Sequence, residues 1–86
     1  MGLVMEWLVL NVQILQQSHQ ALILESGKIR VIAHVNTQFD VKPQDIISPV
    51  KDAFYTINHH IEKRILFLSA CEFTPECWVR LTVPAK

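Results

Sequence analysis

Glycine, cysteine and net charge are all scarce in this sequence, and each shortage excludes a class of protein. The 86 residues include two glycines, two cysteines, and eight basic against eight acidic side chains. Two glycines are too few for the glycine-rich loops that hold nucleotide phosphates, and two cysteines are too few for a disulfide scaffold. A net charge of zero argues against a dedicated nucleic-acid-binding protein, because such proteins usually carry a basic excess. The expected organisation is therefore a single small domain, residues 1–86.

The sequence also lacks a hydrophobic run that could cross a membrane. Its longest uncharged segment, residues 7–24, has seven polar side chains among 18 residues, which is too many for a membrane-spanning helix. No basic region precedes this segment, so a secretory signal is not expected, although Met5 is an alternative start to Met1. We therefore expect a cytoplasmic protein that does not contact membranes and whose two cysteines are reduced.

Branched aliphatic side chains are abundant instead. Leucine, isoleucine and valine make up 27 of the 86 residues, and phenylalanine, tryptophan, tyrosine and methionine add nine more. A domain of this size buries only about 60–65% of the surface that its unfolded chain exposes. A single copy would leave part of this apolar surface in water, and contiguous exposed apolar patches usually mark interfaces. We therefore expect a homodimer or a complex with a protein partner.

The first half of the chain predicts three antiparallel strands. Gly27 lies between two short apolar runs, and glycine accepts the positive φ that a tight hairpin turn requires, so residues 21–37 are expected to form a strand, a turn and a strand. Upstream, residues 6–16 alternate in polarity and favour a strand, with Leu8 and Leu10 on one face and Trp7 and Val9 on the other. A helical stripe also exists there, but it would leave Leu10 in solvent.

The second half predicts one long amphipathic helix. Ser48 and Pro49 resemble an N-cap followed by the first helical residue, and an apolar stripe follows at helical spacing: Val50, Ala53, Phe54, Ile57 and Ile61. The helix is expected to continue to about Leu68, and in the alternative residues 65–73 form a strand that ends in a turn at 74–76. Alternation over 77–83 predicts a last strand. The expected fold class is α+β, an antiparallel sheet in the order β-β-β-α-β, or β-β-β-α-β-β, with the helix packed on one face.

No recognisable catalytic motif is present, and the candidates for chemistry are few. Asp52, Tyr55, His59 and Glu62 would form a line on the predicted helix, but a convex helix face does not form a pocket. Imidazole and thiolate groups are zinc ligands, so the metal-site candidates are His59, Cys71 and Cys77. Adjacent histidines at 59 and 60 point about 100° apart on a helix, and five residues between the cysteines exceed the usual spacing of zinc knuckles. We expect neither a metal nor another cofactor, and a redox pair of cysteines stays open as an alternative.

The tryptophans are the stronger interface candidates, because this residue is enriched where proteins bind one another. Trp7 and Trp78 both lie on the polar face of a predicted strand, and Arg80 is beside the second. The predicted contact residues are Trp7, Trp78, Arg80, Leu66 and Phe67. The sequence thus predicts a non-catalytic interaction or assembly module, of the kind common among bacterial, phage and mobile-element accessory proteins. The alternative is a small-ligand or metal-binding protein, or an enzyme with a site between subunits, using His34, His59, Cys71 and Cys77.

Overall fold

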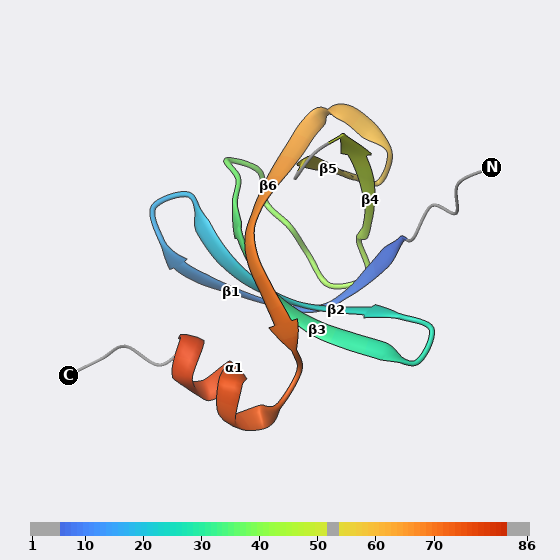
Figure 1. Ribbon diagram of the computed structural model, residues 1–86. Coiled ribbons are helices and arrows are strands. Elements are labelled where there is room, and N and C mark those ends of the chain that lie inside the picture. The colour runs from blue at the N-terminus through green and yellow to red at the C-terminus, as the bar shows by residue number, and fades with distance from the viewer. Residues whose placement is uncertain (1–5, 52–53, 83–86) are drawn as a thin grey trace.

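The computed structural model describes residues 6–51 and 54–82, and within them six strands form a closed barrel with one short helix outside it (Figure 1). The elements are β1 (Trp7–Gln16), β2 (His19–Ser26), β3 (Ile29–Asn36), β4 (Ile46–Lys51), β5 (Phe54–Ile57), β6 (His60–Glu72) and α1 (Pro75–Thr82). The strand order around the barrel is β1-β2-β3-β6-β5-β4, and all neighbours are antiparallel. No described helix has the length and apolar character to span a bilayer.

The barrel consists of two three-stranded meanders, β1-β2-β3 and β4-β5-β6, joined along two seams. The β3–β6 seam is long, with paired residues from Val31 to Asn36 on β3. The β1–β4 seam is short and pairs Trp7 with Ile47 and Leu8 with Ile46. Beyond Val9, therefore, β1 has a partner strand on one side only.

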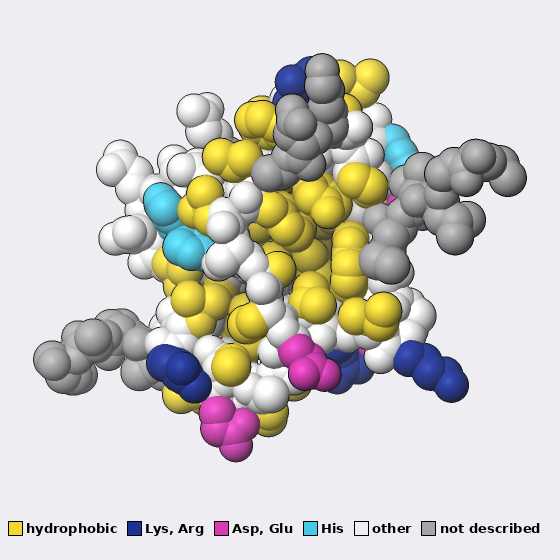
Figure 2. Space-filling model, viewed as in Figure 1, with side chains coloured by type: hydrophobic (Ala, Val, Ile, Leu, Met, Phe, Trp, Pro, Cys, Tyr) yellow, Lys and Arg dark blue, Asp and Glu magenta, His cyan; other side chains and the backbone are white. Residues whose placement is uncertain are grey.

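Apolar side chains fill the barrel interior and also reach the surface. Figure 2 shows them gathered at the centre of one face, with charged side chains toward its border. The large exposed ones among the described residues are Ile14, Ile29, Val50, Phe54, Ile61, Leu68 and Val79.

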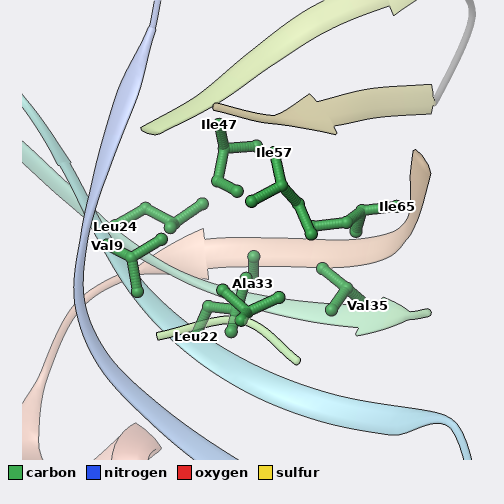
Figure 3. Close-up of a cluster of buried hydrophobic side chains, with 9 residues drawn as sticks. Val9, Leu22, Leu24, Ala33, Val35, Ile47, Ile57 and Ile65 are labelled. Atoms are coloured by element: carbon green, nitrogen blue, oxygen red, sulfur yellow. The ribbon is translucent and has the colours of Figure 1, made fainter. Parts of the chain in front are cut away.

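The core draws on every strand of the barrel (Figure 3). Its buried members are Val9, Leu22, Leu24, Ala33, Val35, Val41, Ile47, Ile57 and Ile65. On β2 the residues from Gln20 to Leu24 are all buried, including those that alternate away from this core. A strand that is buried on both faces reads as a continuous apolar run, and Ala21–Leu24 is such a run.

The predicted hairpin is present, and its turn has the expected chemistry. β2 and β3 pair in register from His19 with Asn36 to Ser26 with Ile29, and Gly27 adopts a φ of 60°. Residues 7–16 form the expected strand, β1, rather than a helix. Bulges between Val9 and Asn11 and between Ile14 and Gln16 interrupt the predicted alternation. Trp7 and Val9, which were expected on the wetter face, pack in the core region, and the bulge after Val9 lets Val12 share their face.

The predicted long helix over residues 48–68 is wrong, and with it the α+β fold class. The described part of this segment forms β4, β5 and most of β6. Asn58 and His59, with φ of 51° and 64°, make the turn between β5 and β6, and asparagine tolerates this left-handed region better than most residues. Pro49 lies where β4 has no partner on its β1 side, a position at which a sheet accepts proline.

The last predicted strand, 77–83, is wrong as well, because its described part lies in α1. The helix begins after Thr74, whose Oγ1 accepts a hydrogen bond of 3.0 Å from the Cys77 amide. Pro75 takes the first helical position and Glu76 lies in the first turn, where an acidic side chain is favourable. The alternative of an extended segment after residue 65 agrees with β6. The turn expected at 74–76 is instead a helix start.

Candidate functional site

A groove of about 240 Å³ lies between the barrel and α1. β3 and β6 form its floor. Three side chains of α1 also line it, because Arg80 and Leu81 follow Cys77 by three and four residues, which places them on the same helix face. The lining residues are Ile32, His34, Ser69, Cys71, Cys77, Arg80 and Leu81. The groove therefore combines an apolar wall with an imidazole, two thiols and a guanidinium group.

A pair of histidines lies beside this groove. Ala21 of β2 pairs with His34 of β3, and His19, two residues before Ala21, places its Nδ1 2.9 Å from Nε2 of His34. One ring nitrogen must donate and the other accept, so the contact requires at least one neutral ring. Partial burial, followed by the neighbouring His19, lowers the pKa of His34 below its ordinary value. The ring of His34 is therefore favoured in its uncharged form.

The two thiols are free and lie in the same groove. Cys71 is exposed on β6, and Cys77 is half-buried on α1. Desolvation raises the pKa of Cys71, the neighbouring Cys77 thiol raises it further, and the charge of Arg80 opposes both effects. An effect of the Cys77 thiol on the pKa of Cys71 requires the two side chains to lie near each other.

A serine, a histidine and a carboxylate also meet near the start of β1. Glu6 Oε2 accepts a hydrogen bond of 2.9 Å from Ser48 Oγ and lies 3.1 Å from His59 Nε2. Nucleophilic catalysis needs the imidazole between the hydroxyl and the acid, because the imidazole must take the hydroxyl proton. Here the carboxylate is in the middle, so this cluster ties the β5–β6 turn to β1 and does not activate the serine.

An apolar patch crosses the β4–β5–β6 sheet, and we call it the outer patch: Val50, Phe54 and Leu66. Phe54 pairs with Leu66 across β5 and β6, so the two side chains share a face, and Val50 lies in the bulge of β4 opposite Phe54. The residue that pairs with Phe54 on β4 is Lys51, which follows Val50 directly. Val50 is 51% exposed and Phe54 39% exposed. Three apolar side chains on neighbouring strands form a surface that a partner protein could cover.

The structure separates the predicted contact residues. Trp7 and Phe67 are half-buried and pack against the core, and the Phe67 ring stacks on Tyr55 at 4.2 Å. Trp78 and Arg80 lie on α1, and Arg80 lines the groove. Leu66 belongs to the outer patch. The role of all five in partner binding stays a prediction.

The metal candidates are separated too. His59 lies in the β5–β6 turn, whereas Cys71 and Cys77 line the groove. Within residues 6–51 and 54–82, no three His, Cys, Asp or Glu side chains are grouped so as to hold a metal ion. Sequence reasoning missed the pairing of His19 with His34, because that contact depends on the strand register. The available signal was that His19 and His34 lie on opposite sides of the predicted turn at Gly27.

Comparison with known proteins identifies relatives along most of the chain. The model of the IraM/PmrD family matches residues 5–79. The signal transduction protein PmrD of Escherichia coli K12 is 34% identical over 79 residues, which cover 88% of this chain and 90% of that protein. The protein of the same name from Salmonella typhimurium LT2 is 32% identical, with 91% and 95% covered.

Two solved structures have the same fold. The crystal structure of E. coli PmrD matches with a TM-score of 0.86 and 37% identity, over 88% of this chain and 93% of that one. The solution NMR structure of PmrD from Klebsiella pneumoniae matches with a TM-score of 0.78 and 27% identity, over 88% and 96%. The likeness supports the strand-rich barrel with a short terminal helix over the α+β fold expected from the sequence. On the family match and the identity to both curated relatives, this chain belongs to the IraM/PmrD family.

Proposed function

We propose that this chain is a non-catalytic signal transduction protein that acts by binding a partner protein. The observation that carries the proposal is its 34% identity, over 88% of its length, to a protein named for signal transduction. The exposed apolar side chains of the barrel supply a surface that such a role needs. A phage or mobile-element origin and a cytoplasmic location remain predictions from the sequence.

The outer patch is the contact surface that we propose for this partner. Val50 and Phe54 are exposed, and Leu66 beside them was already a predicted contact residue. Exposed Lys63 and Arg64 lie on β6 near the patch and would contribute a polar, basic rim. An apolar centre within a polar rim is the usual anatomy of a protein interface.

Site-specific photo-crosslinking in cells tests this surface. A photoreactive amino acid replaces Leu66 in one variant and Lys28, in the exposed β2–β3 turn, in a matched control. We expect a discrete protein adduct from position 66 and none from position 28, and we expect Phe54→Asp to lower the yield at position 66 at least about tenfold, because a charge would be buried. Equal adducts at both positions, or none at 66, would contradict the proposed surface.

We further propose that the chain forms a homodimer through the open edge of β1. Beyond the short β1–β4 seam, residues 10–16 pair with β2 only, and they include no charged side chain. Uncharged edge strands readily pair with another strand, and natural proteins usually prevent such pairing by placing charged side chains on the edge. On this edge, amide side chains take the place of charged ones and bond to the backbone. Asn11 Oδ1 accepts a hydrogen bond from the Val12 amide at 2.8 Å, and Gln13 Nε2 donates one to the Ile14 carbonyl at 3.3 Å.

Sedimentation equilibrium tests the homodimer with two matched lysine variants. Ile14 is 66% exposed on the open edge, and Ile29 is 51% exposed at the start of β3. We expect Ile14→Lys to raise the dimer dissociation constant at least about tenfold, since two like charges would meet across the edge, and Ile29→Lys to leave it unchanged. A monomeric parent chain at 100 µM, or equal effects of the two substitutions, would remove the dimer from the proposal.

A further inference from the structure

The two cysteines lie on consecutive elements that face each other across the groove. Cys71 is the residue before the end of β6, and Cys77 is the third residue of α1. Five residues separate them, and both side chains line the groove between the barrel and α1. Neither is in a disulfide in this structure.

The connection between them is fixed at both ends, which holds the thiols near each other. At the β6 end, the Phe73 amide donates a 3.0 Å hydrogen bond to the Arg30 carbonyl, and the Arg30 guanidinium lies 5.9 Å from the Phe73 ring centroid. At the α1 end, Thr74 accepts from the Cys77 amide through Oγ1 and from the Trp78 amide through its carbonyl, each at 3.0 Å. The chain therefore reverses direction over a defined path and returns Cys77 to the side of Cys71.

The electrostatics of Cys71 indicate the same proximity. Burial is the first cause of its raised pKa, and the neighbouring Cys77 thiol is the next. Both cysteines also remain reachable from solvent, since Cys71 is exposed and Cys77 is half-buried. Oxidants can therefore reach a pair of thiols that is already brought together.

We propose that Cys71 and Cys77 are a modification site, at which a peroxide-class oxidant forms an internal disulfide that fastens α1 to the end of β6. In the first step one thiolate attacks a peroxide oxygen and breaks the O–O bond, giving a sulfenic acid and hydroxide, which leaves as water once protonated. In the second step the other thiolate attacks the sulfenic sulfur and displaces hydroxide, which also leaves as water. With hydrogen peroxide, two thiols and one oxidant molecule become one disulfide and two water molecules.

The disulfide would act on the element that is least firmly held. Within the described chain, α1 is the one element outside the barrel, and none of its residues is fully buried. Short helices with little burial open readily, and a covalent link to the neighbouring strand restricts such opening. Oxidation would therefore lock α1 over the groove, and this inference stands independently of the proposed partner binding.

Intact-mass analysis and amide exchange of the purified full chain test the inference. After reduction, a tenfold excess of hydrogen peroxide is added and the products are compared before and after dithiothreitol. We expect a monomer lighter by about 2 Da with both thiols lost together, and the amide of Trp78 to exchange at least about tenfold more slowly in the oxidised chain. Dithiothreitol should restore the original mass and exchange rate.

Single serine variants provide the controls. Cys71→Ser and Cys77→Ser should each stop at a sulfenic acid or at a disulfide between two chains, and neither should slow exchange at Trp78. Three outcomes would overturn the inference. They are retention of both thiols under peroxide, disulfides that form only between chains, and an internal disulfide that leaves exchange in α1 unchanged.

Discussion

Two isoleucines distinguish the barrel from the helix that the sequence predicted. Ile57 and Ile61 are four residues apart, so a helix would place both on the same buried stripe. In the barrel, Ile57 is 3% exposed in the core, whereas Ile61 is 68% exposed on β6. Truncation of each to alanine should therefore have very different effects on stability.

The magnitude follows from burial. Truncation of a buried isoleucine to alanine costs about 2–5 kcal/mol, from the lost transfer free energy and the cavity that remains. We expect Ile57→Ala to lower the free energy of unfolding by about 3 kcal/mol, and Ile61→Ala to change it by no more than about 0.5 kcal/mol, as is usual for exposed positions. For a domain of this size, 3 kcal/mol corresponds to a fall in Tm of roughly 12–24 °C.

Urea denaturation followed by tryptophan fluorescence measures both changes. Should Ile57→Ala fail to fold, Ile57→Val retains most of the side chain and is expected to cost about 1 kcal/mol. Equal losses for Ile57→Ala and Ile61→Ala would refute the assignment of this segment to β5 and β6. A loss above about 1.5 kcal/mol for Ile61→Ala would refute the exposure of β6 at that position.

Three further predictions address the turn, the histidine pair and the helix cap. Asn58 adopts a left-handed φ and accepts a 2.8 Å hydrogen bond from the Ile46 amide, so Asn58→Ala should cost about 1–2 kcal/mol in urea denaturation, and Asn58→Gly, which keeps the favourable backbone, less. Because the folded pKa of His34 is lowered from 6.5, stability from this group is fully present above that pH and is lost as pH falls toward the folded pKa. Tm should therefore fall more steeply from pH 7.5 to 5 in the parent chain than in His34→Gln. Thr74→Ala removes the α1 cap, so amide exchange in α1 should accelerate about fivefold, for a loss near 1 kcal/mol, without a change in β2 exchange.

Local chemistry was sufficient for the hairpin in the first half of the fold. The hairpin around Gly27 is defined by one turn residue and two apolar runs, so residues 21–37 could be assigned without knowledge of distant contacts. The face that β1 turns toward the core could not be assigned in this way, because it depends on the bulges in the pairing with β2 and on the β1–β4 seam. For that reason Trp7 was expected on a wet face and is found against the core.

In the second half, the same local helix-start signal leads to a strand at one position and to a helix at another. A hydroxyl residue followed by proline occurs at Ser48 and again at Thr74, and it begins a helix only at the second. After Ser48 the chain is rich in β-branched and aromatic residues, which favour strands once a neighbouring strand is available. An amphipathic stripe with a spacing of three and four residues does not exclude two strands joined by a tight turn.

The candidate site was predicted only in part. Cys71, Cys77 and His34 were named as candidates for ligand binding and Arg80 as a partner-contact residue, and the structure places all four along the groove. Their proximity depends on α1 folding back along β6, which the strand predicted at 77–83 did not allow. The outer patch was missed except for Leu66, because Val50 and Phe54 were assigned to the buried stripe of a helix that does not form.

The unequal seams between the two meanders determine how this barrel would come apart. Separation along β1–β4 breaks the pairing of two residues on each strand, whereas separation along β3–β6 breaks the pairing of β3 from Val31 to Asn36. The easier fluctuation thus leaves each meander intact and lets one rotate away from the other, with β3–β6 as the hinge. The interior that this rotation uncovers is lined by Val9 and Ile47, so a binding partner could select the opened state without unfolding either half.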